Sequence, residues 1–403
     1  MEHIPLTELK NRQSQCLELL DRLRPDAGGL MIFNRLNIYY FTGTMGAGVY
    51  WLPKTGSPLL MVRKGSERAL FDNPGLAVAT YRSFSDLPVL ASEHGSPLTP
   101  VIAAEQSALP WSLAENLQRR LPQTNFINAD QVLTRLRAVK SPWELGKMRN
   151  AGALHAKAAE ELLPQRISPG MTELKVAHAT SKVFYSLGGC GLTRLNAFGE
   201  ELLLGEVSVG DNGNFPTFYN GPLGCRGAHP AAPFLGCPET VWRDGQLLVL
   251  DAGFCFEGYN SDKTVCYFAG IRSEIPPLAS KAFEVCLKIE EIIAARMRPG
   301  AIPLELYAEA VQMAEKAGFS EGFMGLGGNK VPFIGHGIGL CIDEWPVLAP
   351  RFDSPLQAGM TLALEPKIGL EGIGMVGTEN TWEITENGAV CLSGCGQEII
   401  CVE

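Results

Sequence analysis

The sequence predicts a mixed α/β (α+β) fold of two domains, and the second domain contains an internal duplication. Three observations carry this prediction. Short apolar runs alternate with helical patterns before residue 138, a helix-start signal follows at residues 140–144, and one succession of helices and strands then occurs twice. With 403 residues, 46% of them hydrophobic, the chain is long enough for two packed cores. We expect domains at residues 1–138 and 141–403.

The first domain is predicted from apolar runs that are too short for helices. Gly, Pro and Asn bound these runs, which is typical of strands. The predicted strands cover residues 29–33, 37–43, 58–62 and 101–104. Helical periodicity appears near residues 6–23 and 112–121. These segments together predict an α/β domain.

The second domain begins at a capping-box signal. Ser141 is the predicted N-cap, Pro142 the first helical residue, and Glu144 the acid three positions after the cap. We expect a helix from there to about residue 163, a turn at Pro169-Gly170, and a helix over residues 172–187.

The same succession returns about 130 positions later. Helical patterns cover residues 275–297 and 304–317, and Pro299-Gly300 separates them. We therefore predict two similar halves, each with two helices and then strands, facing each other around a curved antiparallel sheet. The alternative is a chance recurrence of Pro-Gly between helices.

Composition narrows the classes of function. A net charge of -9 argues against a protein that binds nucleic acid through its phosphates. No apolar stretch approaches the roughly 20 residues that span a bilayer, and the first residues lack a signal-peptide pattern. The eleven cysteines form no CxxC pair, and Cys391 and Cys395 are the nearest neighbours. We expect free thiols and a cytoplasmic location.

Four acids and one histidine stand out because ordinary cores do not tolerate them. Each lies at or near the end of a predicted strand or between glycines, and the set is Asp251, Asp262, His336, Glu365 and Glu379. Adjacent strands of one sheet would bring them together. A buried carboxylate is costly unless positive charge compensates it, and two divalent cations would match four carboxylates. Oxygen donors with one imidazole suit Mn, Co, Fe or Zn. For any one of these acids alone, capping of a turn is the alternative.

These motifs resemble the pita-bread metallopeptidase family, which includes methionine aminopeptidase, prolidase, aminopeptidase P and the non-peptidase creatinase. The resemblance covers residues 141–403. The first domain resembles the creatinase/prolidase N-terminal domain, best at residues 37–43.

The resemblance implies two divalent ions, manganese first and Co, Zn or Fe as alternatives. Asp251 would be a terminal ligand of one ion, His336 and Glu365 would hold the other, and Asp262 and Glu379 would bridge. It also implies a homodimer and an Xaa-Pro aminopeptidase or dipeptidase that acts on small peptides or peptide-like substrates. In such an enzyme a metal-bridging hydroxide attacks, and Glu365 or a neighbouring residue moves the proton.

The chain departs from the family pattern at several positions. Asp343 occupies the position at which family peptidases have a second histidine. Phe234 occupies the position at which they have a further histidine, so His229 is the nearest histidine that could take that role at the site. Asp343 would act as a protonated donor, bind a cationic substrate group, or merely cap a turn. Gly377 replaces an arginine that binds the substrate carboxylate in prolidases, and Val265 replaces the arginine of a Thr-Arg-Thr segment.

These departures keep other functions open. One alternative is a creatinase-like, non-peptidase hydrolase or lyase acting on a small nitrogenous or zwitterionic metabolite. A second is a binding module without catalysis, against which the intact ligand set argues.

Overall fold

The computed structural model describes residues 2–196, 202–396 and 398–403. The chain divides into two compact units, one up to Arg137 and one from Ala138. Among the described helices none combines the length and apolarity needed to cross a bilayer.

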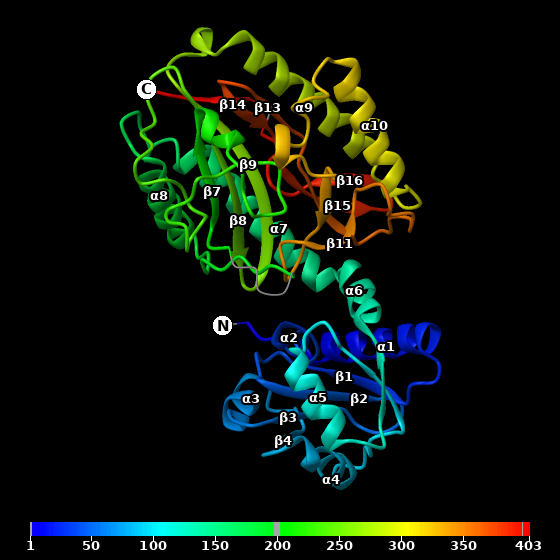
Figure 1. The fold of residues 1–403 in the computed structure, drawn as a ribbon. Coiled ribbons are helices and arrows are strands. Elements are labelled where there is room, and N and C mark those ends of the chain that lie inside the picture. The colour runs from blue at the N-terminus through cyan, green and yellow to red at the C-terminus, as the bar shows by residue number, and fades with distance from the viewer. Residues whose placement is uncertain (1, 197–201, 397) are drawn as a thin grey trace. The chain divides into compact units, whose positions relative to one another are not determined.

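The first unit contains a six-stranded mixed sheet in the order β4-β3-β2-β1-β5-β6 (Figure 1). Only the pairs β1–β2 and β2–β3 are antiparallel. The strands are β1 (Gly29–Ile32), β2 (Gly48–Pro53), β3 (Leu59–Val62), β4 (Val78–Thr80), β5 (Val101–Ala104) and β6 (Asn125–Asn128). The helices are α1 (Leu6–Leu23), α2 (Arg35–Thr42), α3 (Ser66–Asp72), α4 (Leu87–Glu93), α5 (Trp111–Arg120) and α6 (Asp130–Ala138).

Helices cover both faces of this sheet. On one face Phe41 of α2 stacks on Tyr50 of β2, and Gln13 of α1 donates a hydrogen bond to the Tyr50 hydroxyl. On the other face Trp51 packs in a buried cluster with Leu117 of α5. The predicted strands at 29–33, 58–62 and 101–104 and both predicted helices are confirmed.

One predicted strand is wrong, because residues 37–43 belong to helix α2. The Asn34 side chain accepts a hydrogen bond from the Leu36 N–H at 2.8 Å and caps the helix. Gly43 ends it with φ of 77°, a left-handed conformation that glycine adopts without strain. These two caps outweigh the strand preference of the aromatic and β-branched residues between them.

The second unit begins with helices α7 (Pro142–Ala156) and α8 (Glu173–Ser186), and a π-helical turn extends α7 over Lys157–Leu162. These helices pack on a sheet in the order β17-β9-β8-β7. Its strands are β7 (Gly205–Val209), β8 (Leu247–Phe256), β9 (Tyr259–Ala269) and β17 (Ile400–Val402).

The second helix pair, α9 (Pro277–Arg296) and α10 (Pro303–Lys316), covers the other strands (Figure 1). These form a sheet in the order β11-β10-β12-β15-β16 and the hairpin β13-β14. Their bounds are β10 (Gly335–Gly337), β11 (Glu344–Val347), β12 (Thr361–Leu364), β13 (Lys367–Leu370), β14 (Gly374–Gly377), β15 (Asn380–Thr385) and β16 (Gly388–Cys391). The predicted fold class, with two helix pairs that each precede strands, is confirmed.

The expectation of free thiols throughout is wrong at one pair. Cys391 and Cys395 form a disulfide. The chain turns at Gly394, whose φ is +88°, and brings the two Cα atoms within 6.2 Å. The spacing alone did not reveal this turn.

The contribution of the capping box at the start of α7 to stability can be tested by mutation. The Ser141 hydroxyl accepts the Glu144 N–H at 3.2 Å, and Glu144 accepts the Ser141 N–H at 3.1 Å. Replacing Ser141 with Ala should lower the free energy of unfolding by about 1 kcal/mol, because a helix N–H loses its acceptor. Chemical unfolding measures this change. The control Ser186→Ala, at the exposed end of α8, should change it by less than about 0.5 kcal/mol, and equal effects would contradict the capping role.

Candidate metal centre

Two of the predicted acids lie on one hairpin of the second unit. In the antiparallel pair β8–β9, Asp251 is opposite Thr264 and Gly253 is opposite Asp262. Residues two apart on a strand share a face, so Asp251 and Asp262 project diagonally to the same side. The β8–β9 pair therefore places both carboxylates together, as expected for adjacent strands of one sheet.

The histidine enters from a second sheet, where its glycine neighbours allow close backbone packing. His336 lies in β10 opposite Ala363 of β12. A Cβ atom on Gly335 would lie 2.3 Å from the Ala363 carbonyl oxygen, and one on Gly337 would lie 2.4 Å from the Trp345 carbonyl oxygen. Only glycine fits beside His336 on both sides.

Glu365 and Glu379 lie side by side at the ends of paired strands. Glu365 follows β12 and Glu379 precedes β15, and the terminal residues of these strands, Leu364 and Asn380, are paired. The Thr264 hydroxyl of β9 donates a hydrogen bond to Glu379 Oε2 at 2.8 Å. This bond joins the two sheets at the cluster.

The Nε2 atom of His336 faces one oxygen from each of three carboxylates. The Nε2 atom lies 3.5 Å from Glu365 Oε1, 3.9 Å from Asp262 Oδ2 and 4.0 Å from Glu379 Oε1. The two longer separations exceed hydrogen-bond length. They match ligand atoms that share one ion at about 2.1 Å each. The Nδ1 atom lies 3.1 Å from the Gly337 carbonyl oxygen, and donation there leaves Nε2 to bind an ion.

The other side of the cluster is occupied by Lys367, which the sequence analysis did not single out. Its buried Nζ lies 3.0 Å from Asp251 Oδ2, 2.8 Å from Glu365 Oε2 and 2.8 Å from Glu379 Oε2. A lysine two positions after Glu365, at the start of an otherwise apolar strand, was the available signal. The ligand atoms of Asp262, His336 and Glu379 lie within 4.8 Å of one another, and so do those of Asp251, Glu365 and Glu379, so each group could hold an ion. On the Asp251 side, however, the Lys367 ammonium group already lies among the oxygens.

Glu206 is a second residue that the sequence analysis missed. It lies in β7 opposite Asp251 and is buried. Burial, and then the nearby Asp251 carboxylate, raise the pKa of Glu206 well above its ordinary value. An isolated acid in the run Gly205–Val209 was the only sign of it in the sequence.

Burial and mutual repulsion shift the pKa values of the clustered acids upward. Burial raises the pKa of Asp251 to about 6, and burial and the neighbouring carboxylates raise that of Asp262 well above its ordinary value. Burial alone would lower the pKa of Lys367, but three carboxylates outweigh it and raise the pKa well above the usual range. A divalent cation would compensate the remaining charge.

The cluster lines a cavity of about 270 Å³. All five predicted ligands, Glu206 and Asp343 are among the lining residues. Asp343 Oδ1 accepts the Asn196 N–H at 2.6 Å, so this carboxylate also fastens a neighbouring loop. His229 is exposed, accepts the Ala231 N–H at 3.0 Å, and is not among the described residues that line the cavity.

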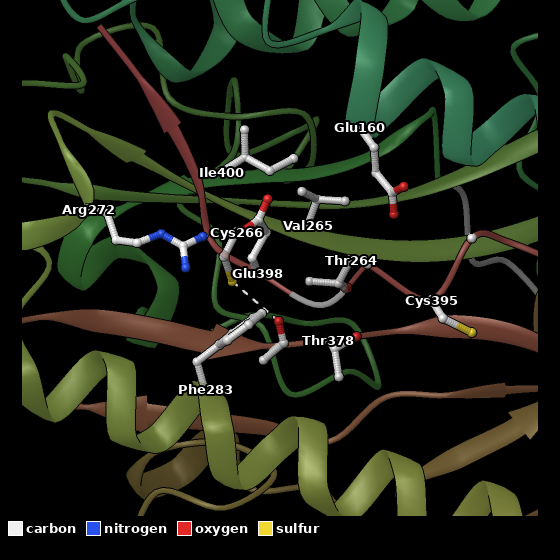
Figure 2. Close-up of a pocket in the computed structure, with 13 residues that line it drawn as sticks. Glu160, Thr264, Val265, Cys266, Arg272, Phe283, Thr378, Cys395, Glu398 and Ile400 are labelled. Atoms are coloured by element: carbon white, nitrogen blue, oxygen red, sulfur yellow. Dashed lines mark hydrogen bonds and ion pairs between the residues drawn. The ribbon is translucent and has the colours of Figure 1, made fainter.

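A larger cavity of about 680 Å³ lies nearby (Figure 2). Its lining includes Thr264, Cys266, Arg272 and Glu398, and Cys266 donates to the Gly377 carbonyl. Its described lining residues include none of the five predicted ligands. We therefore place the chemistry at the smaller cavity.

Comparison with known proteins decides the family. Residues 146–386 match the profile of Metallopeptidase family M24, and residues 12–139 match the Creatinase/Prolidase N-terminal domain. The chain belongs to metallopeptidase family M24. Membership of this family implies divalent metal ions, and it confirms the resemblance stated from the sequence.

Named relatives of the chain in this family span nearly its whole length. It is 25% identical to an Xaa-Pro dipeptidase of Pyrococcus furiosus over 97% of this chain and 100% of the relative. It is 28% identical to the probable dipeptidase PepE of Mycobacterium tuberculosis over 94% of this chain and 93% of the relative. The prolidase structure from Pyrococcus horikoshii OT3 superposes with a TM-score of 0.78 at 22% identity, covering 97% of this chain and 100% of that one.

The Thr264–Glu379 bond predicts an effect on metal affinity. Thr264→Val removes the hydroxyl that fixes one oxygen of Glu379, and loss of such support typically costs 10- to 100-fold in affinity. Calorimetric titration with Mn²⁺ measures it. Thr264→Ser keeps the hydroxyl and should retain the affinity for Mn²⁺. Equal losses in both variants would contradict the supporting role of the Thr264 hydroxyl.

Proposed function

We propose that this M24 chain is a metal-dependent hydrolase of small peptides, of the Xaa-Pro dipeptidase or aminopeptidase type. The observation that carries the proposal is the convergence of His336, Asp262, Glu365 and Glu379 around one point at the wall of a cavity. The relatives named as Xaa-Pro dipeptidases and dipeptidases support the same class.

The proposed metal is manganese, with Co, Zn or Fe as alternatives. Imidazole and carboxylate donors suit these ions. The sequence prediction of two ions conflicts with the place of Lys367, which is taken up below. The homodimer and the cytoplasmic location stay predictions from the sequence.

The residues at the cavity would have different roles in hydrolysis. An ion at the His336 position would polarise the substrate carbonyl and make water more acidic. Glu365 reaches this position with Oε1, while Lys367 holds its Oε2 at 2.8 Å and fixes the carboxylate. We propose that Glu365 accepts a proton from the attacking water and passes it to the leaving nitrogen.

The role of Glu365 is tested by removing its carboxylate. Glu365→Ala should lower turnover of Xaa-Pro dipeptides about 10²- to 10⁴-fold, the usual contribution of a general base. The control Glu371→Ala lies on the exposed turn after β13 and should retain turnover. Unchanged turnover in Glu365→Ala would remove this mechanism.

A second candidate function rests on the composition of the cavity. Asp343 lines the cavity with a carboxylate where family peptidases have histidine. Gly377, which is not among the described lining residues, stands where prolidases have the arginine that binds a substrate carboxylate. Such a cavity suits a small substrate with a cationic group. Assays of Xaa-Pro dipeptides and tripeptides against amidines, ureas and betaine-like compounds separate the two functions, and turnover of the small compounds alone would overturn the peptidase proposal.

The peptidase proposal makes a specific prediction for Asp343. An imidazole there can donate a hydrogen bond to the developing oxyanion, so Asp343→His should raise turnover of Xaa-Pro peptides by about tenfold or more. Asp343→Asn is the matched control, since its amide oxygen can still accept the Asn196 N–H. A rise of equal size in both variants would mean that charge removal, and not the imidazole, acts on turnover.

A further inference from the structure

The distribution of cations in the acid cluster departs from the two-ion centre that the sequence predicted. We propose that the ammonium group of Lys367 permanently replaces one of the two metal ions, so that the centre binds a single divalent ion. This ion would be held by Asp262, His336, Glu365 and Glu379. Asp251 would form an ion pair with the ammonium group of Lys367 and would not bind the ion. The inference rests on the proposed function for its catalytic meaning, but metal binding tests it independently.

The first argument is that Glu365 and Glu379 each face both Lys367 and His336. Glu365 and Glu379 each direct Oε2 to Lys367 Nζ at 2.8 Å and Oε1 toward His336 Nε2, at 3.5 and 4.0 Å. Two carboxylates that each face two positions are what a pair of adjacent cations requires. Here one of these positions is filled by a covalent part of the chain.

The second argument is the difference in spacing between the two positions. Around Lys367 the three oxygens lie at 2.8–3.0 Å from Nζ, which are the lengths of direct charge-assisted hydrogen bonds. Around His336 the donor atoms lie 3.5–4.0 Å from Nε2, so an additional atom is needed to join them. The cluster is closed on the Lys367 side and open on the His336 side.

The third argument is that the β13–β14 hairpin holds the backbone of Lys367 in place. Lys367 pairs with Gly377 across β13–β14. A Cβ atom on Gly377 would lie 2.8 Å from Lys367 Cγ and 2.5 Å from the Pro366 carbonyl oxygen. The Lys367 Cα atom would lie closer than its Cγ, at 2.7 Å, so glycine at position 377 lets the two backbones approach closely and holds the strand from which the lysine extends.

The fourth argument is the cost of moving the ammonium group away. Lys367 has no exposed surface, and its three partners Asp251, Glu365 and Glu379 are acids. Breaking a buried ion pair leaves uncompensated charge and is strongly unfavourable. Lys367 is also not among the described residues that line the cavity, so it positions the carboxylates and does not contact substrate.

Metal stoichiometry tests the inference on the full-length protein, purified without chelators. Calorimetric titration with Mn²⁺ and elemental analysis should find one ion per chain in the wild type, with the electron paramagnetic resonance spectrum of an isolated ion. Lys367→Ala, which empties the closed position, should bind two ions and show exchange coupling between them. Lys367→Arg keeps a cation and should bind one.

A second variant avoids the risk that Lys367→Ala folds poorly. Asp251→Asn should leave the single ion and its affinity unchanged if Asp251 serves only Lys367, whereas loss of one bound ion would show that Asp251 is a metal ligand. Two ions or none in the wild type, or one ion in a folded Lys367→Ala protein, would overturn the inference. Absence of peptide hydrolysis with one bound ion would instead overturn the proposed function alone.

Discussion

The compensation of buried carboxylates by positive charge is the constraint on which the second unit depends. Asp262, Glu365 and Glu379 are buried, and Asp251 faces the same point. Ionised acids this close together repel one another and lose hydration, which costs several kcal/mol per group unless cations are present. The strand ends can converge only because Lys367, and by our proposal a metal ion, stand between them. The same constraint explains why the cluster has the capacity to bind an ion at all.

A lysine differs from a metal ion in ways that affect the enzyme. It is part of the chain, so the Asp251 side of the cluster is assembled on folding whatever the concentration of metal. A bound ion stabilises the folded state by an amount that grows with the logarithm of the ratio of its concentration to its dissociation constant. An ammonium group also lacks open coordination positions, so it orients carboxylates but cannot bind a carbonyl oxygen as an ion does. The activation of substrate then falls to the His336 side, next to Asp343 and the cavity.

Much of the site could be predicted from the sequence because its ligands have unusual neighbours. A histidine between glycines and acids that end apolar runs do not suit an ordinary core, and Gly335 and Gly337 prove to be needed for strand contact. Lys367 could not be predicted in this way. Its role depends on the β13–β14 hairpin, which connects Glu365 to Glu379. The hairpin places the lysine ammonium group between Asp251, Glu365 and Glu379. Similarly, the position of His229 depended on a loop length that spacing alone could not give.

The fold could be predicted where local signals agreed with packing. The capping box at Ser141 and the repeated helix pairs gave correct elements, because the helix-start signal, the helical periodicity and the Pro-Gly pairs agreed with the packing. Residues 37–43 have the composition of a strand, and there the Asn34 cap and the left-handed Gly43 decided for a helix. The short edge strands β4 and β6 went unpredicted because each is completed by pairing with a strand from an earlier part of the chain.

The most direct measurement is anomalous diffraction from crystals grown with excess Mn²⁺. We expect one anomalous peak per chain, within bonding distance of His336 Nε2, Asp262, Glu365 and Glu379. Electron density for Lys367 should continue to a nitrogen atom between Asp251, Glu365 and Glu379. Two peaks, with the lysine side chain turned out of the cluster, would contradict the single-ion centre.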